Sequence, residues 1–274
     1  MIKELLYTIF DICKIIRAGN LFSLKNFKTN KTNKTLYILG NGKSLNNSNL
    51  KENEHVDFLV VNRHVLSENY KEIKPRYYVL ADPHFFQHSE GLSILKRIND
   101  ETLWEMTIYL PYNKNTRYTL VSKYINNRNI SIVYYNLNSF RGFRCILHFL
   151  YTKQLSMPIV QNVLVASIMI GILLKYKTIE LFGVEHTWTR YLYVDENNVV
   201  YLDNPHFFDK EKEKAKPLKE IQHTDEYPFY LILENYSRMF KSYWEINEWI
   251  KCKKMDVKII NKTPGSFIDA FEKG

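Results

Sequence analysis

Short apolar runs recur along the chain, and most of them end abruptly on polar residues. Each run has the length and the β-branched or aromatic content of a buried strand, whereas two longer segments between them have helical periodicity. The strand-like runs cover residues 36–39, 56–63, 77–83, 106–111, 130–135, 177–185 and 257–261, and the helical segments cover residues 160–174 and 229–249. This alternation predicts an α/β fold with a Rossmann-like, mostly parallel sheet and helices on both faces.

The remaining segments complete the predicted organisation. Residues 1–17 carry apolar side chains largely on one helical face, which predicts an amphipathic helix, and residues 24–35 are polar and basic, as in a linker. Residues 1–35 therefore precede a main domain of residues 36–274. Within that domain, residues 186–228 lose regular periodicity and indicate a lid or an acceptor-binding insertion. After the turn at residues 263–266 we expect a closing helix.

The turn that follows the first apolar run is the clearest candidate site. Gly40 and Gly42 allow a ligand to approach the backbone closely, because no Cβ stands in the way. Leu45 takes the place of the third glycine of a dinucleotide fingerprint, so that fingerprint is not supported. An NTPase is not expected either. The turn indicates a cradle for a phosphate or a nucleotide.

Polar residues also follow the other strand-like runs. Asn41, Asn62 and Asp82 come at the ends of the first three runs, and Gly183 and Glu185 end a later one. In an open parallel sheet, ligands bind outside the carboxyl ends of the strands, so these residues are expected along one cleft. Taken singly, each Asn or Asp is as well explained by turn formation.

Composition and charge limit the classes of partner and the compartment that we expect for this chain. The 274 residues carry a net charge of +9 that is spread along the chain, and they contain no RNA-recognition, zinc-finger or helix-turn-helix signature, so nucleic acid is not the expected partner. The three cysteines lie far apart, which favours a reducing cytoplasm over a disulfide framework. No apolar stretch reaches the roughly 20 residues of a membrane span. The helix of residues 1–17 fits either peripheral contact with the inner face of the cytoplasmic membrane or docking on the protein or on another subunit of a homo-oligomer.

No metal or cofactor is expected. The sequence contains no D-x-D triplet, and His84 and His88 follow Pro83 in an apparent loop without the glutamate of an H-E-x-x-H motif. Histidine titrates near neutrality, so the candidates for acid-base chemistry are His186, His206 and His223. A structural role explains any one of them equally well.

Taken together, these motifs resemble a family. Residues 39–45 are similar to the G-N-G-P-S-L opening of the small bacterial sialyltransferases that modify lipooligosaccharide, with Lys43 in place of the proline. Residues 61–63, 158–163 and 176–185 resemble that family's second strand end and its helix followed by a strand ending in Gly-x-Asp. Residues 261–266 resemble its closing turn. The same opening occurs in the motility-accessory glycosyltransferases and in a group of pterin diphosphokinases.

The resemblance implies a metal-independent transferase that binds a nucleotide-activated sugar. By position, it assigns residues to the nucleotide (Asn41, Gly42, Ser44), to its ribose or phosphate side (Asn62), to the donor (Gln161, Asn162) and to the nucleoside (Gly183, Glu185). Tyr193 matches the spacing of a tyrosine on the leaving phosphate, and Arg190 is the alternative for that contact. Asp82 joins this set through its place at a strand end.

Three functions follow as hypotheses. The first is transfer of a sugar from a nucleotide sugar to a glycan or glycolipid acceptor in bacterial surface polysaccharide or lipooligosaccharide biosynthesis, with His223, His186 or His206 as the base. The second is pyrophosphoryl transfer to a pterin-like alcohol, which normally needs a magnesium site built from carboxylates. The third is a non-catalytic nucleotide-binding or assembly protein.

Overall fold

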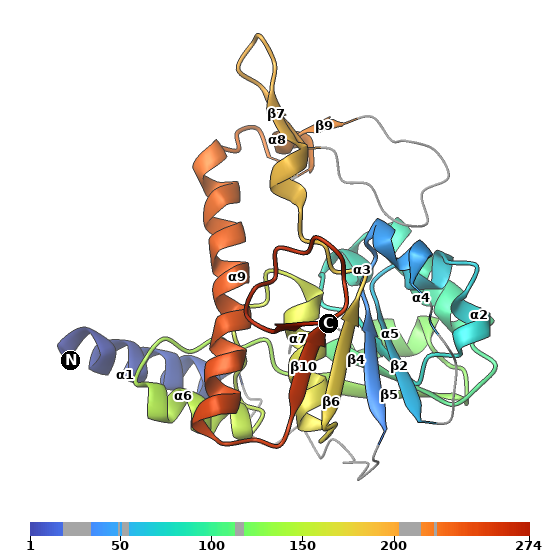
Figure 1. Cartoon of the computed structure of the whole chain (residues 1–274), viewed down its shortest axis with the longest axis horizontal. Coiled ribbons are helices and arrows are strands. Elements are labelled where there is room, and N and C mark those ends of the chain that lie inside the picture. The colour runs from blue at the N-terminus through green and yellow to red at the C-terminus, as the bar shows by residue number, and fades with distance from the viewer. Residues whose placement is uncertain (19–33, 49, 51–54, 113–117, 203–214, 222–223) are drawn as a thin grey trace.

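The chain folds around one eight-stranded sheet in which every strand pairing is parallel (Figure 1). The computed structural model describes residues 1–18, 34–48, 50, 55–112, 118–202, 215–221 and 224–274. The strand order is β11-β10-β6-β1-β2-β3-β4-β5. The strands are β1 (Thr35–Leu39), β2 (Val56–Val61), β3 (Tyr77–Val79), β4 (Met106–Pro111), β5 (Ile130–Tyr135), β6 (Thr178–Phe182), β10 (Lys258–Asn261) and β11 (Glu272–Lys273). The predicted α/β class with a parallel sheet is confirmed.

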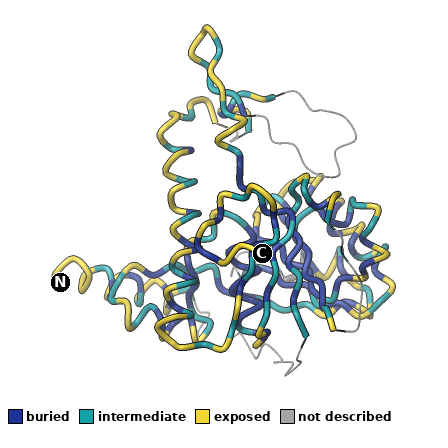
Figure 2. The backbone as a smooth tube through the Cα atoms, in the orientation of Figure 1, coloured by how far each residue is buried: buried dark blue, intermediate teal, exposed yellow. Residues whose placement is uncertain are grey.

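Helices cover both faces of this sheet, as predicted. The α-helices of the main domain are α2 (Tyr70–Ile73), α3 (His84–Gln87), α4 (Ser89–Glu101), α5 (Tyr118–Tyr124), α6 (Arg144–Thr152), α7 (Val163–Leu173) and α9 (Phe229–Cys252). Successive side chains of a strand point to opposite faces. Leu36 and Ile38 of β1 accordingly lie in the core shared with α7 and α9, whereas Leu39 lies in the core shared with α3 and α4. Figure 2 shows the resulting buried strands between the more exposed helices.

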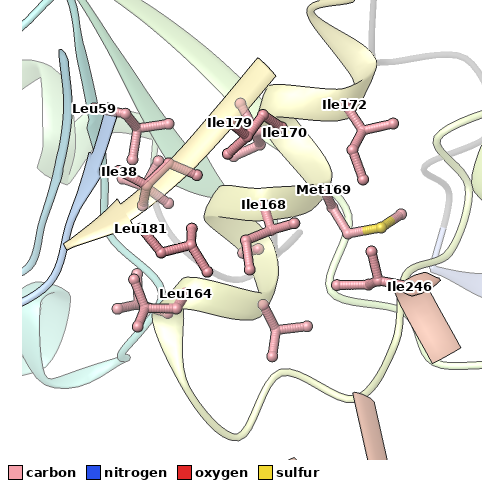
Figure 3. Packing of buried hydrophobic residues seen from close by; sticks show 14 of the residues in the cluster. Ile38, Leu59, Leu164, Ile168, Met169, Ile170, Ile172, Ile179, Leu181 and Ile246 are labelled. Carbon is pink, nitrogen blue, oxygen red and sulfur yellow. The ribbon is translucent and has the colours of Figure 1, made fainter. Parts of the chain in front are cut away.

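Helix α7 lies at the centre of the core that it shares with β1 and α9. All of its residues from Val163 to Ile172 are buried, which explains why its sequence is apolar on every side. Leu164, Ile168 and Ile172 pack between the strands and helix α9 (Figure 3). The helix begins where the side chain of Asn162 accepts a hydrogen bond from the Leu164 amide at 2.9 Å.

The chain reverses direction across the sheet between β1 and β6. From β1 it proceeds through β2, β3, β4 and β5 on one side, then returns through α7 to β6 on the other side of β1. Such a switch point leaves a crevice outside the carboxyl ends of the two strands. The topology thus places the ends of β1 and β6 next to each other, at the expected position of a ligand.

The insertion is more regular than its sequence indicates. It contains a short antiparallel sheet and helical turns: η3 (Trp188–Tyr191), β7 (Leu192–Val194), β8 (Val200–Leu202), β9 (Lys216–Pro217) and α8 (Leu218–Ile221). Leu202 and Leu218 pack against Ile232 near the start of α9. Figure 1 shows β7, β9 and α8 beside the start of α9, at the top of the view. His206, His223 and most of the expected linker of residues 24–35 lie outside the described residues.

Two local predictions are wrong. The expected closing helix after residue 266 is absent from this described segment, since the Ser266 hydroxyl donates to the Val184 carbonyl at 2.7 Å and the Phe267 amide donates to the Glu185 carbonyl at 2.9 Å. These bonds hold the segment across the end of β6, and it continues into β11. The segment that contains His84 is the short helix α3 and not a loop, because Asp82 accepts a hydrogen bond from the His84 amide at 2.8 Å.

Helix α1 (Ile2–Arg17) is present as predicted. It packs on the main domain through Ile15, which meets Phe140 and Leu150. Among the described residues, no helix combines the length and the apolar character that crossing a bilayer requires.

Candidate functional site

A pocket of about 270 Å³ lies at the carboxyl ends of β1, β2 and β6, at the switch point of the sheet. Its walls come from the ends of these strands, from the start of α7 and from the start of the insertion. The lining residues are Gly40, Asn41, Gly42, Lys43, Val61, Asn62, Asn162, Val163, Leu164, Gly183, Glu185, His186, Thr187, Trp188 and Tyr191. The pocket thus brings together Asn41, Gly42, Asn62, Asn162, Gly183, Glu185 and His186 from the predicted set.

At the floor of the pocket, the backbone that follows β1 contacts the backbone at the end of β6. The Gly40 amide donates to the Phe182 carbonyl at 2.8 Å, and the Gly42 amide donates to the Gly183 carbonyl at 2.9 Å. A Cβ on Gly40 would lie 2.2 Å from the Gly183 oxygen, and Gly183 itself has a φ of +63°. Only glycine fits this close approach of the β1 and β6 ends.

Glu185 occupies the glycine turn. Its Oε1 accepts a hydrogen bond of 2.6 Å from the Ser44 amide, and a Cβ added to Gly42 would lie 1.4 Å from its Oε2. The sequence predicted a cradle for a phosphate or a nucleotide at this turn, and in the structure the Ser44 amide is already bound to a carboxylate of the protein. Gly42, Lys43 and Ser44 match the end of a P-loop, yet Tyr37 stands at the position of the first glycine of that motif. This part of the pocket presents a negative charge, which suits hydrogen-bond donors such as hydroxyl and amino groups.

Asn41 follows β1 and Asn62 follows β2, and the two side chains share a feature. The Oδ1 atom of each is buried and has no hydrogen-bond partner among the described residues. Buried polar atoms of folded proteins are nearly always paired, so two orphaned acceptors in one pocket indicate a ligand that donates hydrogen bonds. The acceptors of the pocket therefore include these two amide oxygens and the Glu185 carboxylate.

The backbone at Asn62 is held in an uncommon conformation. Its φ is +52°, in the left-handed region that asparagine tolerates better than most residues. The buried Tyr78 hydroxyl donates to the Asn62 carbonyl at 2.6 Å and accepts from the Val65 amide at 3.1 Å. These bonds hold the backbone at Asn62 in place, and its left-handed conformation favours an asparagine at the end of this strand.

The amino-terminal end of α7 supplies the opposite electrostatic character. Val163 and Leu164 of its first turn line the pocket, so the positive end of an 11-residue helix lies at the cavity. Lys43 adds an exposed cation to the same lining. The pocket thus has an acceptor-rich side at Glu185, Asn41 and Asn62, and it carries positive charge at the start of α7 and at Lys43 of the glycine turn.

His186 lines the pocket but is poorly suited as a base. It is buried, and its Nε2 lies 2.6 Å from the Tyr243 hydroxyl, with the Trp188 ring centroid 4.5 Å away. Burial lowers the pKa of His186 to about 3, so the ring is neutral at pH 7 and binds a proton only weakly. The ring joins the start of the insertion to α9, which is a structural role.

Five predicted residues are not among those that line the pocket. The Ser44 amide is bound to Glu185, and the Asp82 side chain accepts a hydrogen bond from the His84 amide at the start of α3. Gln161 is exposed beside Asn162. The Arg190 guanidinium lies 4.8 Å from the centroid of Phe267, and the Tyr193 ring stacks on Tyr201 at 5.2 Å.

Other lining residues were missed by the sequence. Tyr191 and Trp188 face the pocket from η3, in a segment whose aromatic residues have no regular period. Lys43 sits inside the glycine turn and was noted only as a replacement for proline. Among the described residues, no group of three or more His, Cys, Asp or Glu side chains is arranged to hold a metal ion.

Comparison with known proteins finds a distant likeness of fold. No protein-family model and no curated protein sequence matches the chain. The sialyltransferase CstII from Campylobacter jejuni, solved with the substrate analogue cytidine-5'-monophosphate, is similar with a TM-score of 0.46 and 17% identity, over 89% of this chain and 86% of that one. The sialyltransferase Cst-I, an α-2,3 enzyme of the same organism, has a TM-score of 0.48 and 16% identity, over 90% and 83%.

The MAf glycosyltransferase from Magnetospirillum magneticum has a TM-score of 0.48 and 12% identity, over 96% of this chain and 38% of that one. The sialyltransferases and the motility-accessory glycosyltransferases that the motifs resemble are thus both found among similar structures. A likeness of this strength concerns the fold and carries no conclusion about the reaction of this chain.

Proposed function

We propose that this chain is a glycosyltransferase that acts without a metal ion in the cytoplasm. It moves a sugar from a nucleotide-sugar donor to a glycan or glycolipid acceptor in the synthesis of a bacterial surface polysaccharide or lipooligosaccharide. The observation that carries this proposal is that the switch-point pocket combines an acceptor-rich side with positive charge at the start of α7 and at Lys43. A nucleotide sugar has the matching groups, with hydroxyl and amino groups at its ends and phosphate between them.

In this proposal the nucleoside lies against Glu185 and the glycine floor. The carboxylate spends one oxygen on the Ser44 amide, and its remaining lone pairs accept from ribose hydroxyls or from an exocyclic amine. Asn41 and Asn62 accept from further hydroxyl groups, which satisfies their orphaned Oδ1 atoms. Asn162, next to the start of α7, contacts the donor from the other wall.

The leaving phosphate lies at the start of α7. Its charge is offset by the helix dipole and by the Lys43 ammonium group, which together do the work that a metal ion does in other transferases. Tyr191 lines this pocket and is better placed for a phosphate contact than Tyr193 or Arg190. The Tyr193 ring stacks on Tyr201 of the insertion, and the Arg190 guanidinium packs on Phe267 of the closing segment.

The acceptor hydroxyl loses its proton to a histidine of the insertion. Because the pKa of His186 is about 3, we assign this role to His223, with His206 as the alternative. Residues 186–228 then act as a lid that delivers the base and the acceptor to the donor. General-base assistance of this kind contributes roughly 10²–10⁴-fold to the rate.

The pterin diphosphokinase alternative is less well supported by the lining. Pyrophosphoryl transfer normally uses carboxylates to hold magnesium, and Glu185 is the one carboxylate among the described lining residues. That carboxylate is already bound to the Ser44 amide.

Nucleotide-dependent thermal stabilisation tests the binding part of the proposal. Screening CMP, CDP, UDP and GDP should find one nucleotide that raises the melting temperature, because a ligand of the native state stabilises by mass action. Asn62→Gly keeps the left-handed backbone and removes the amide, so it should weaken binding. Asn198→Gly is the matched control, since Asn198 has a φ of +60° and is not among the pocket-lining residues. Equal binding by the two variants would refute the role of Asn62.

Product analysis tests the reaction. Release of CMP, CDP, UDP or GDP from the matching sugar nucleotide supports glycosyl transfer, whereas release of AMP from ATP supports the diphosphokinase. Nucleotide binding without turnover of any sugar nucleotide supports a non-catalytic protein. Turnover that survives EDTA supports metal independence.

A further inference from the structure

Helix α1 turns its polar side toward the protein. Thr8, Asp11 and Ile15 are its buried residues. Asp11 accepts hydrogen bonds from the backbone amide of Arg141 at 2.8 Å and from its guanidinium at 2.9 and 3.2 Å, and Thr8 accepts from the Phe143 amide at 3.0 Å. The helix is therefore anchored by polar contacts, with one apolar side chain among its three buried residues.

The apolar residues of α1 point away from the protein. At about 100° per residue, they cover an arc of about 140° on the side away from Asp11. This outer face of α1 consists of Ile2, Leu5, Leu6, Ile9, Phe10 and Ile16, whose exposed fractions run from 49% to 76%. Figure 2 shows the exposed helix extending from the body of the protein. Docking on the main domain does not account for this face, because the docked side is a different one.

The charges beside the outer face have one sign. Lys3, Lys14 and Arg17 follow one edge of the apolar arc by helical periodicity, and all three are exposed. The acidic residues Glu4 and Asp11 lie on the other side of the helix, where Asp11 pairs with Arg141. An apolar strip with a basic edge complements a surface that is negatively charged outside and apolar beneath, which is the surface of an anionic phospholipid bilayer.

A second copy of the chain fits this face less well. In a two-fold symmetric dimer the same surface patch of each copy meets across the interface, so an antiparallel pair of α1 helices would bring their basic edges together. Like charges at short distance oppose such pairing, whereas an anionic surface attracts them.

We propose that the outer face of α1 lies in the interface of an anionic phospholipid bilayer, with its apolar side chains among the acyl chains and its basic edge at the headgroups. The attachment does not depend on the proposed reaction. It makes α1 a peripheral anchor that is joined to the main domain through the ion pair of Asp11 and Arg141.

Vesicle sedimentation of the full chain tests this proposal. The protein should sediment with vesicles of 30% phosphatidylglycerol in phosphatidylcholine, bind pure phosphatidylcholine much less, and dissociate as salt is raised. Leu6→Ser with Ile9→Ser removes apolar area and should lower partitioning at least roughly ten-fold. Lys3→Gln with Lys14→Gln should lower it roughly 25-fold, or about five-fold for each cation.

A matched control separates this face from exposed apolar surface in general. Leu103 is 82% exposed and lies between α4 and β4, so Leu103→Ser should leave sedimentation unchanged. Circular dichroism and the nucleotide-dependent thermal shift check that each variant is folded. Sedimentation that is equal in all variants overturns the proposal. So does a dimer, seen by light scattering without lipid, that Leu6→Ser with Ile9→Ser dissociates.

Discussion

Gly42→Ala tests the arrangement on which the candidate site depends. The methyl group would lie 1.4 Å from the Glu185 Oε2 atom, so the carboxylate must move. Gly42 has a φ of −78°, which alanine adopts without strain, so the backbone itself gives no reason for a loss of stability. The effect of this variant therefore reports on the contact between the turn and Glu185.

The expected loss is that of one charge-assisted hydrogen bond. Moving Glu185 breaks its bond to the Ser44 amide, which is 2.6 Å long and partly buried. Bonds to charged groups contribute about 1.5–3 kcal/mol, so the free energy of unfolding should fall by about 2 kcal/mol. For a domain of this size that corresponds to a drop in melting temperature of about 4–8 °C.

A double-mutant cycle isolates the contact. Gly42→Ala and Glu185→Ala should each destabilise by a similar amount, and the double variant should be no worse than either, because both changes remove the same bond. Urea denaturation measures the three free energies, and the thermal shift with the best nucleotide measures the site. We expect the nucleotide response to disappear in all three variants.

Two results would refute this reasoning. If the destabilisations of the two single variants add in the double variant, Gly42 and Glu185 act independently and the carboxylate does not occupy the turn. If Glu185→Ala retains the full nucleotide response, the acceptor-rich side of the pocket does not bind the nucleoside.

Three further predictions concern the histidines and α1. Burial lowers the pKa of His186 from 6.5 to about 3, so below pH 6.5 the unfolded chain binds a proton that the native state excludes. The free energy of unfolding should therefore fall as the pH drops from 6.5 toward 3, by up to about 1.4 kcal/mol per pH unit. Urea denaturation of His186→Gln between pH 6.5 and 4.5 should show a shallower decline, and an unchanged slope would contradict it. Asp11→Ala removes the bonds between α1 and Arg141, so it should lower the free energy of docking of α1 by about 1–3 kcal/mol. Amide hydrogen exchange in residues 2–17 should then be faster, with nucleotide binding unchanged. Unchanged exchange would count against the Arg141 anchor. His223→Ala should lower turnover roughly 10²–10⁴-fold while donor binding survives, and near-normal turnover would exclude it as the base.

The sheet and the location of the pocket could be predicted from the sequence because both depend on local patterns. Each strand is a short apolar run that stops at a polar residue, and parallel strands bring those ends to one edge. Asn41 and Asn62 were found by this rule. Asp82 satisfies the same rule but accepts a hydrogen bond from the His84 amide, so a polar residue at a strand end does not by itself distinguish a ligand contact from a local turn contact.

The contacts that define the site depend on long-range geometry. Glu185 and Ser44 are 141 residues apart, and their hydrogen bond follows from the adjacent placement of β1 and β6, which no local pattern encodes. The pairing of His186 with Tyr243 is similar, since it depends on where α9 crosses the start of the insertion. Without these contacts, an amide-lined phosphate cradle and a catalytic His186 are reasonable expectations from the residue types alone.

The position of Glu185 also changes how the glycine turn should be understood. In a phosphate-binding loop the glycines bring amide groups to an anionic ligand. Here the missing side chain of Gly42 leaves space for the Glu185 carboxylate, and the Ser44 amide donates its hydrogen bond to that carboxylate. A free phosphate at the Ser44 amide would meet the like charge of Glu185. In the proposed function this part of the turn therefore faces the nucleoside of the donor, and the phosphate lies at the start of α7.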